Sequence, residues 1–127
     1  MTHELKREAV MLIYDTIEQH GLVQTLHSVF GKRIPVSISL NRAVCDTEVA
    51  ELELSVRAYN CLRRANISTV GELADLAMSG GMNHLRNMGK KTISEIQTKL
   101  LCFAYREASP AWRKEFIEDL LDKKCRQ

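Results

Sequence analysis

The sequence predicts a mostly α-helical protein, and three observations support this prediction. Apolar residues recur at intervals of three and four along most of the 127 residues, a spacing that places them on one side of a helix. Residues that commonly cap helices precede several of these segments. Only one stretch, the segment 34–40 around Pro35, alternates apolar and polar residues instead, which indicates one short edge strand or an extended linker.

The N-terminal part of the sequence predicts two helices. Apolar positions at helical spacing give a first helix over about 3–20, and Gly21 follows it as a stop. A shorter helix spans about 22–30 and ends at Gly31. Both helices belong to a helical N-terminal extension, which we assign to residues 1–48.

Capping residues predict the helices of the central region. Ser55 is a good N-cap for a helix that runs to about Ala65. Thr69, with Glu72 three residues later, forms a capping box at the start of a helix over 70–77.

Two more helices complete the expected order. A short helical turn is expected at 83–86, and Gly89 opens the longest helix of the central region. Ser109 as N-cap and Pro110 at the first helical position start a last helix. Residues 107–127 are therefore predicted to be a C-terminal amphipathic helix.

Composition and charge indicate an ordinary globular protein, and the sequence shows no recognisable set of catalytic residues. Of the residues, 45% are hydrophobic and 27% are charged, and the net charge is +2. Basic residues outnumber acidic ones over 57–99, whereas acidic residues dominate 41–56, so we expect two differently used surfaces. The histidines are scattered and no Ser/His/Asp or Cys/His spacing recurs, so no enzymatic activity is expected.

The cysteines and the apolar runs give no sign of a metal site, a cofactor or a membrane segment. Four widely separated cysteines form no Cys-x-x-Cys pair, so we expect no zinc and no other cofactor. The first residues lack the apolar core of a signal peptide, and the longest apolar run, 9–14, is too short to cross a bilayer. We expect a cytoplasmic protein that does not contact a membrane.

A first cluster of candidate DNA-binding residues lies at the start of the helix capped by Ser55. Arg57 falls in its first turn, and the polar residues that follow on the same side are Asn60, Arg63 and Arg64. An arginine here can enter a narrow minor groove, and Asn60 can hydrogen-bond an acceptor on the DNA. The alternative is a solvated helix face with a surface ion pair.

A second cluster has the form of a helix-hairpin-helix turn, Asn87-Met-Gly-Lys-Lys-Thr92. Gly89 permits close approach of the backbone, and Lys90 and Lys91 can neutralise phosphates. Lysines are unfavourable at a helix N-terminus, so their presence points to a compensating anion. The alternative is a turn glycine followed by a solvated start of a helix.

Both clusters, with their order and separation, closely resemble the C-terminal domain of the bacterial RNA polymerase α subunit. The resemblance covers Val49 to Tyr105. It implies a compact four- to five-helix domain with helix-hairpin-helix-like turns over 49–106, flanked by the two helical extensions.

The resemblance also implies a surface that binds A+T-rich double-stranded promoter DNA in the minor groove. The matching positions are Arg57, Asn60, Cys61, Arg63, Asn87, Gly89, Lys91, Thr92 and Glu95. Lys90 joins them from the charge argument alone. For Thr92 and Glu95, helix capping explains the residue type equally well.

Protein partners follow less directly from the sequence. The resemblance implies contacts with sigma factor, transcription activators or RNA polymerase near Glu51 and Glu53. The alternative function is a protein-interaction or self-association module that uses the same helical fold without significant DNA binding. A homodimer is open, because the apolar stripes of the terminal helices must be buried either on the central module or on a second copy.

Overall fold

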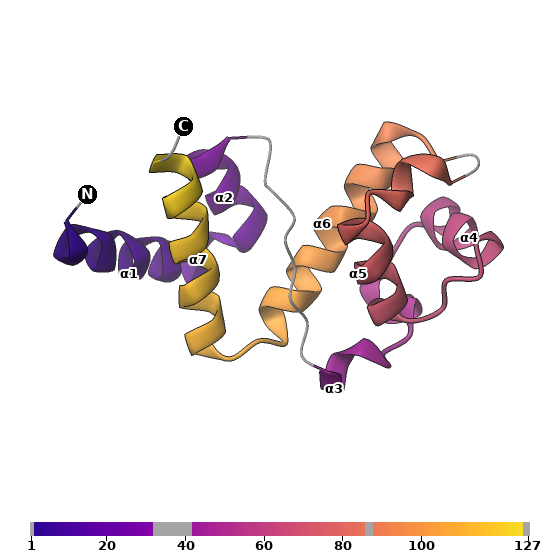
Figure 1. Ribbon diagram of the computed structural model, residues 1–127, viewed down its shortest axis with the longest axis horizontal. Helices are drawn as coiled ribbons and strands as arrows, with labels where there is room; N and C mark the ends of the chain where they lie inside the picture. Colours follow the sequence, from indigo (N-terminus) through magenta and orange to yellow (C-terminus); the bar gives the residue numbers. More distant parts are fainter. Residues whose placement is uncertain (1, 32–41, 86–87, 126–127) are drawn as a thin grey trace. The chain divides into compact units, whose positions relative to one another are not determined.

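The computed structural model describes residues 2–31, 42–85 and 88–125 (Figure 1). These residues contain helices and turns but no strand, which confirms the mostly α fold. The segment 34–40, where the sequence suggests a strand or linker, lies outside the described residues.

The protein forms two compact units. The first, which we call the terminal unit, combines Met1–Pro35 with Ala108–Gln127, and the second, the central unit, is Val36–Glu107. Residues 1–35 of the predicted N-terminal extension thus share one unit with the C-terminal extension, whereas residues 36–48 belong to the central unit.

Three helices build the terminal unit: α1 (His3–His20), α2 (Leu22–Phe30) and α7 (Pro110–Cys125). α1 packs against both α2 and α7. Gly21 joins α1 to α2 with a φ of 93°, a backbone conformation that other residue types rarely adopt. The bounds of α1 and α2 confirm the two helices predicted for this part of the sequence.

The apolar stripes of these helices bury one another. The buried residues of the terminal unit include Val10, Ile13, Ile17, Leu26, Phe116, Ile117, Leu120 and Leu121. At the edge of this core, Lys6 Nζ of α1 lies 2.6 Å from Asp122 Oδ1 and 3.1 Å from Glu118 Oε1 of α7. These bonds, first that to Asp122, raise the pKa of Lys6. Within this unit the N- and C-terminal helices therefore cover each other's apolar faces.

α7 starts where its sequence predicts. Ser109 Oγ accepts a hydrogen bond of 3.2 Å from the backbone N–H of Trp112, and Pro110 occupies the first helical position, where a missing N–H costs nothing. The Trp112 ring stacks on that of Phe116, with centroids 5.4 Å apart.

Four α-helices and two 3₁₀ turns build the described part of the central unit. In order they are α3 (Arg42–Cys45), η1 (Val49–Leu52), α4 (Val56–Arg64), α5 (Val70–Met78), η2 (Gly81–His84) and α6 (Lys90–Arg106). α6 contacts η1, α4 and α5. The side chains of Leu62, Val70, Leu73, Ile96 and Leu100 are fully buried, so residues of α4, α5 and α6 supply much of the core.

The helices that the sequence places after Ser55, Thr69 and Gly89 are present. The helical turn expected at 83–86 instead spans 81–84 as η2. Gly80, with a φ of 74°, ends α5 and starts the new turn at once, and glycine takes this conformation far more readily than other residues do.

Thr69 and Glu72 cap α5. Thr69 Oγ1 accepts a bond of 3.2 Å from the backbone N–H of Glu72. In return, the hydroxyls of Thr69 and Ser68 donate to Glu72 Oε1 over 3.0 and 3.1 Å. These hydroxyl bonds, first that of Thr69, lower the pKa of the Glu72 carboxyl, because they favour its ionised form.

Since the pKa of Glu72 is lowered, we expect the stability of the folded protein to depend on pH. Because the pKa of Glu72 is lower in the folded protein, the ionised carboxylate stabilises the fold at any pH above its ordinary pKa of 4.5. This stabilisation is lost as the pH falls through the lowered pKa of the folded protein. Thermal unfolding of the wild type and of Glu72→Gln should differ by a constant amount above that pH and converge below it. A difference that does not change with pH would show that the ionised carboxylate is not what stabilises this cap.

Candidate nucleic-acid interface

The start of α4 fixes the position of the first basic cluster. Ser55 Oγ accepts a hydrogen bond of 3.2 Å from the backbone N–H of Ala58, as the predicted N-cap should. Helical backbone therefore begins at Val56, and Arg57 lies exposed in the first turn.

Glu95 of α6 completes this cap from 40 residues further along the sequence. Its Oε2 accepts a bond of 2.6 Å from the backbone N–H of Ser55, and its Oε1 accepts one of 2.8 Å from Ser55 Oγ. The first turn of α4 contains no acidic residue of its own. A carboxylate from α6 thus stands at the positive end of α4, where the helix dipole favours it.

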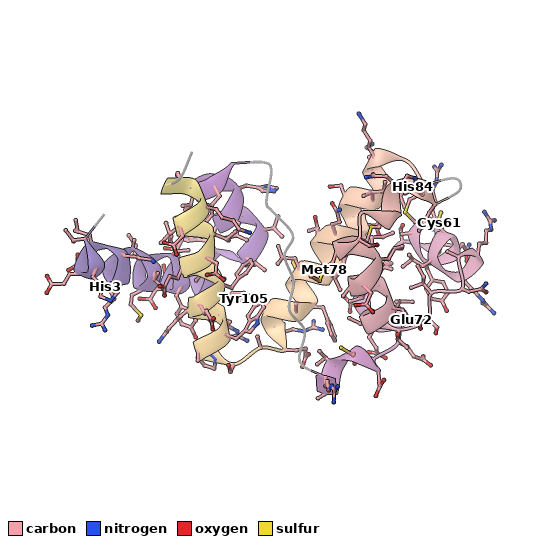
Figure 2. All side chains as sticks on the ribbon, viewed as in Figure 1. His3, Cys61, Glu72, Met78, His84 and Tyr105 are labelled. Carbon is pink, nitrogen blue, oxygen red and sulfur yellow. The ribbon has the colours of Figure 1, made fainter. Side chains whose placement is uncertain are left out.

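α4 and the turn before α6 line one open groove of about 550 Å³. Its lining residues are Arg57, Asn60, Cys61, Arg64, Leu85, Met88 and Gly89. Figure 2 labels Cys61 on α4 and His84 at the end of η2, directly before the turn. The groove therefore brings Arg57 and Asn60 of the first cluster next to Gly89 of the second, whereas Lys90 and Lys91 are not among its described lining residues.

The predicted polar residues of α4 fall into two groups. Arg57 and Asn60 are exposed and line the groove, together with Arg64. Arg63 is exposed as well, but it is not among the lining residues. Within the described parts of the protein, no carboxylate forms an ion pair with these arginines, so the surface-ion-pair alternative gains no support.

Gly89 has an ordinary backbone conformation, with φ −82° and ψ 173°. A Cβ built at this position meets no described atom within 4 Å. Neither backbone strain nor internal packing therefore requires glycine here. The bare backbone leaves the groove open to a molecule that approaches from outside.

The N-terminus of α6 combines N–H donors with positive charge. Gly89 is its N-cap, no side-chain oxygen of a described residue accepts a bond from its first N–H groups, and the first turn holds no acidic residue. Lys90 and Lys91 follow and are exposed. Uncapped N–H groups and nearby cations together form a site to which an anion is attracted.

Two predicted residues, Cys61 and Thr92, are largely buried. They are 6% and 8% exposed, so little of either residue is available to a ligand. Asn87 lies outside the described residues. Contact of these residues with DNA stays a prediction, as it does for Glu95, whose carboxylate is occupied by Ser55.

Three residues near the groove were not among the predicted site. Leu85 and Met88 line it, and Val56 is 77% exposed beside Arg57. In sequence these apolar residues look like core positions. In the structure Leu85 and Met88 are half-buried where they line the groove, whereas Val56 is exposed.

The acidic pair predicted to contact proteins lies next to η1. Glu51 is exposed within η1, and Glu53 lies directly after it, in left-handed backbone with a φ of 56°, and is exposed as well. Both residues are therefore accessible.

Across residues 2–31, 42–85 and 88–125, no group of three His, Cys, Asp or Glu residues is arranged to hold a metal ion. The described cysteines, Cys45, Cys61 and Cys102, are not joined by disulfides. None of the described helices is long and apolar enough to cross a membrane.

Known proteins similar to this one share its central region. The family model that describes the C-terminal domain of the alpha subunit of bacterial RNA polymerase matches residues 37–101. The sequence is 53% identical over 57 residues to DNA-directed RNA polymerase subunit alpha of Clostridium beijerinckii, a match that covers 45% of this protein and 18% of that relative. It is 48% identical over 60 residues to the same subunit of Cytophaga hutchinsonii, covering 47% of this protein and 18% of the relative.

The protein thus spans less than a fifth of the length of these curated relatives. No solved structure matches it. The similarity contains both clusters of the groove and leaves α1, α2 and α7 outside the matched residues.

Since Glu95 of α6 bonds to Ser55 at the start of α4, we expect substitutions of these two residues to have coupled effects on the free energy of unfolding. Glu95→Ala should lower the free energy of unfolding by about 1–3 kcal/mol, because it removes two charge-assisted bonds. In a Ser55→Ala background the same change should cost less, since the bond to the hydroxyl is already gone. Chemical denaturation of the four proteins measures this, and strictly additive effects would show that the Ser55 hydroxyl and the Glu95 carboxylate do not interact.

Proposed function

The protein belongs to the family of the C-terminal domain of the bacterial RNA polymerase alpha subunit, and on this premise we propose that its central unit is a DNA-binding module in transcription. Its ligand is double-stranded DNA, preferentially A+T-rich, bound through the minor groove and the phosphate backbone. The module itself carries out no catalysis, and it acts in the cytoplasm.

The observation that carries this proposal is the groove shared by α4 and the turn before α6. Arg57 and Asn60 line it from one side, and Gly89 lines it from the other. Cationic and amide groups thus face the same space as a bare stretch of backbone. Proteins use these three kinds of group on DNA phosphates, sugars and base edges.

Arg57 supplies the preference for A+T-rich sequence in this proposal. Narrow minor grooves concentrate negative potential and attract an inserted arginine more strongly than wide ones do. Arg57 is suited to this because it projects from the first turn of a helix whose start Glu95 holds in place. Asn60, one turn later, is suited to hydrogen-bond an acceptor on the same DNA.

The start of α6 supplies affinity without sequence preference. The first N–H groups of α6, with Lys90 and Lys91, offer donors and charge to a phosphate. The cost of two lysines at a helix N-terminus is then offset in the complex by the bound anion. Thr92, Cys61 and Asn87 occupy further positions of the family's DNA-binding pattern.

Protein partners in transcription are part of the same proposal. Glu51 and Glu53 are exposed and offer an acidic surface to sigma factor, to activators or to RNA polymerase. The relatives are named as subunits of DNA-directed RNA polymerase, and we propose that this protein works alongside that enzyme.

A second candidate function is protein interaction through the terminal unit. α1 buries one apolar face but leaves Leu5 and Leu12, which share another side of the helix, 55% and 68% exposed. Exposed apolar residues that cluster on one helix favour a partner protein or a homodimer. This function does not need the groove of the central unit.

A titration separates the two candidates. Fluorescence anisotropy of A-tract and G+C-rich duplexes should show tighter binding to the A-tract, with an affinity that falls steeply as salt rises. No binding at low salt would exclude the DNA-binding function and favour protein interaction.

Two substitutions in the interface should have different effects on sequence preference. Arg57→Ala should cost about 1–3 kcal/mol of binding and reduce the preference for the A-tract, because it removes the minor-groove contact. Lys91→Ala should weaken binding to both duplexes equally and lower the salt dependence, because it removes a phosphate contact. Equal affinities of the wild type and Arg57→Ala for both duplexes would contradict the minor-groove assignment.

Gly89→Ala should separate folding from binding. Its backbone conformation suits alanine and the site is open, so stability should stay the same or rise by about 0.4–1 kcal/mol. Affinity for DNA should fall, because the added methyl group occupies the space that the DNA backbone needs. Thermal unfolding and anisotropy on the same sample measure both, and an unchanged affinity would show that DNA does not approach this turn.

A further inference from the structure

Two neighbouring arginines end α4, and the structure distinguishes between them. Each residue of an α-helix is rotated by about 100° from the one before it, so Arg64 lies within about 20° of Arg57, two turns along. Arg63 lies about 120° away from Arg57 by the same geometry. The lining of the groove agrees, because it includes Arg57, Asn60 and Arg64 but not Arg63.

Neither solvent exposure nor the helix dipole explains why Arg64 lines the groove and Arg63 does not. Both arginines are exposed, and both lie in the last turn of α4, where the helix dipole favours any cation equally. What separates them is the direction in which each projects. Arg64 faces the space occupied by the two clusters, and Arg63 faces away from it.

The charge of Arg64 is available to a ligand. No described carboxylate forms an ion pair with it, and the groove that it lines has no acidic residue among its lining residues. Among the described residues, the two arginines of the groove therefore have no countercharge. An anion from outside the protein is the group that would compensate them.

We propose that Arg64 is a phosphate-binding residue of the DNA interface, and that Arg63 makes no contact there. This inference rests on the proposed DNA-binding function and reverses the roles that the family pattern gives to the two positions. Seven residues of helix separate Arg64 from Arg57 by about 10.5 Å along the axis. With Arg57 in the minor groove, Arg64 binds the sugar-phosphate backbone that borders it, so it adds affinity and register but no base preference.

The adjacent arginines provide a matched pair of variants. Arg64→Ala and Arg63→Ala remove the same group from neighbouring positions of one helical turn, so their effects on helix stability should be alike. Anisotropy titrations of A-tract and G+C-rich duplexes at several salt concentrations give the affinity and its salt slope. Arg64→Ala should weaken binding to both duplexes several-fold and reduce the slope of log K against log salt by about 0.9, one phosphate contact. Arg63→Ala should leave both quantities at the wild-type values.

A charge-conserving variant tests the role of Arg64 further. Arg64→Lys should recover most of the affinity and the slope, whereas Arg64→Gln should behave like Arg64→Ala. Thermal unfolding of each variant establishes that the fold is intact.

The outcomes distinguish this inference from the function on which it rests. If the wild type binds DNA and Arg57→Ala loses the A-tract preference, but Arg64→Ala affects the slope no more than Arg63→Ala does, this inference alone is overturned. If the wild type binds no duplex at low salt, the proposed function fails and the inference fails with it.

Discussion

The contact between Glu95 and Ser55 is the constraint on which the candidate interface depends. α4 has no acidic residue in its first turn, and a helix of nine residues is too short to be stable without tertiary support. Glu95 reaches from α6 and satisfies both the backbone N–H and the hydroxyl of Ser55. The position of Arg57, two residues later, is thereby tied to α6, whose own N-terminus forms the other side of the interface.

The groove gives the interface its chemistry because its groups are not used inside the protein. The arginines that line it lack ion pairs with described residues, neither backbone conformation nor packing against described atoms requires Gly89, and no side-chain oxygen of a described residue caps the first turn of α6. In the isolated protein, Lys90 and Lys91 at the start of α6 oppose the helix dipole. Together these features suit a polyanion, because one ligand would contact all of them.

Local sequence signals were sufficient to predict most helices but not their assembly. Ser55, Thr69 and Ser109 cap the helices expected of them, because a cap depends on residues only three positions apart. The short elements α3 and η1 carry no apolar periodicity and were not predicted. The cap by Glu95 and the different directions of Arg63 and Arg64 depend on how α4 packs on α6. Spacings of three and four grouped both arginines with Arg57, whereas the helix geometry separates them.

The most direct test of this account is to map a DNA complex residue by residue, with ¹H–¹⁵N spectra recorded while an A-tract duplex is added to the 127-residue protein. The account predicts that the largest shift changes fall on the exposed side of α4 and on residues 88–91, with little change in the terminal unit. Changes confined to the terminal unit, or to α5 with α4 unaffected, would contradict the claim that Glu95 presents α4 and the start of α6 as one DNA-binding surface.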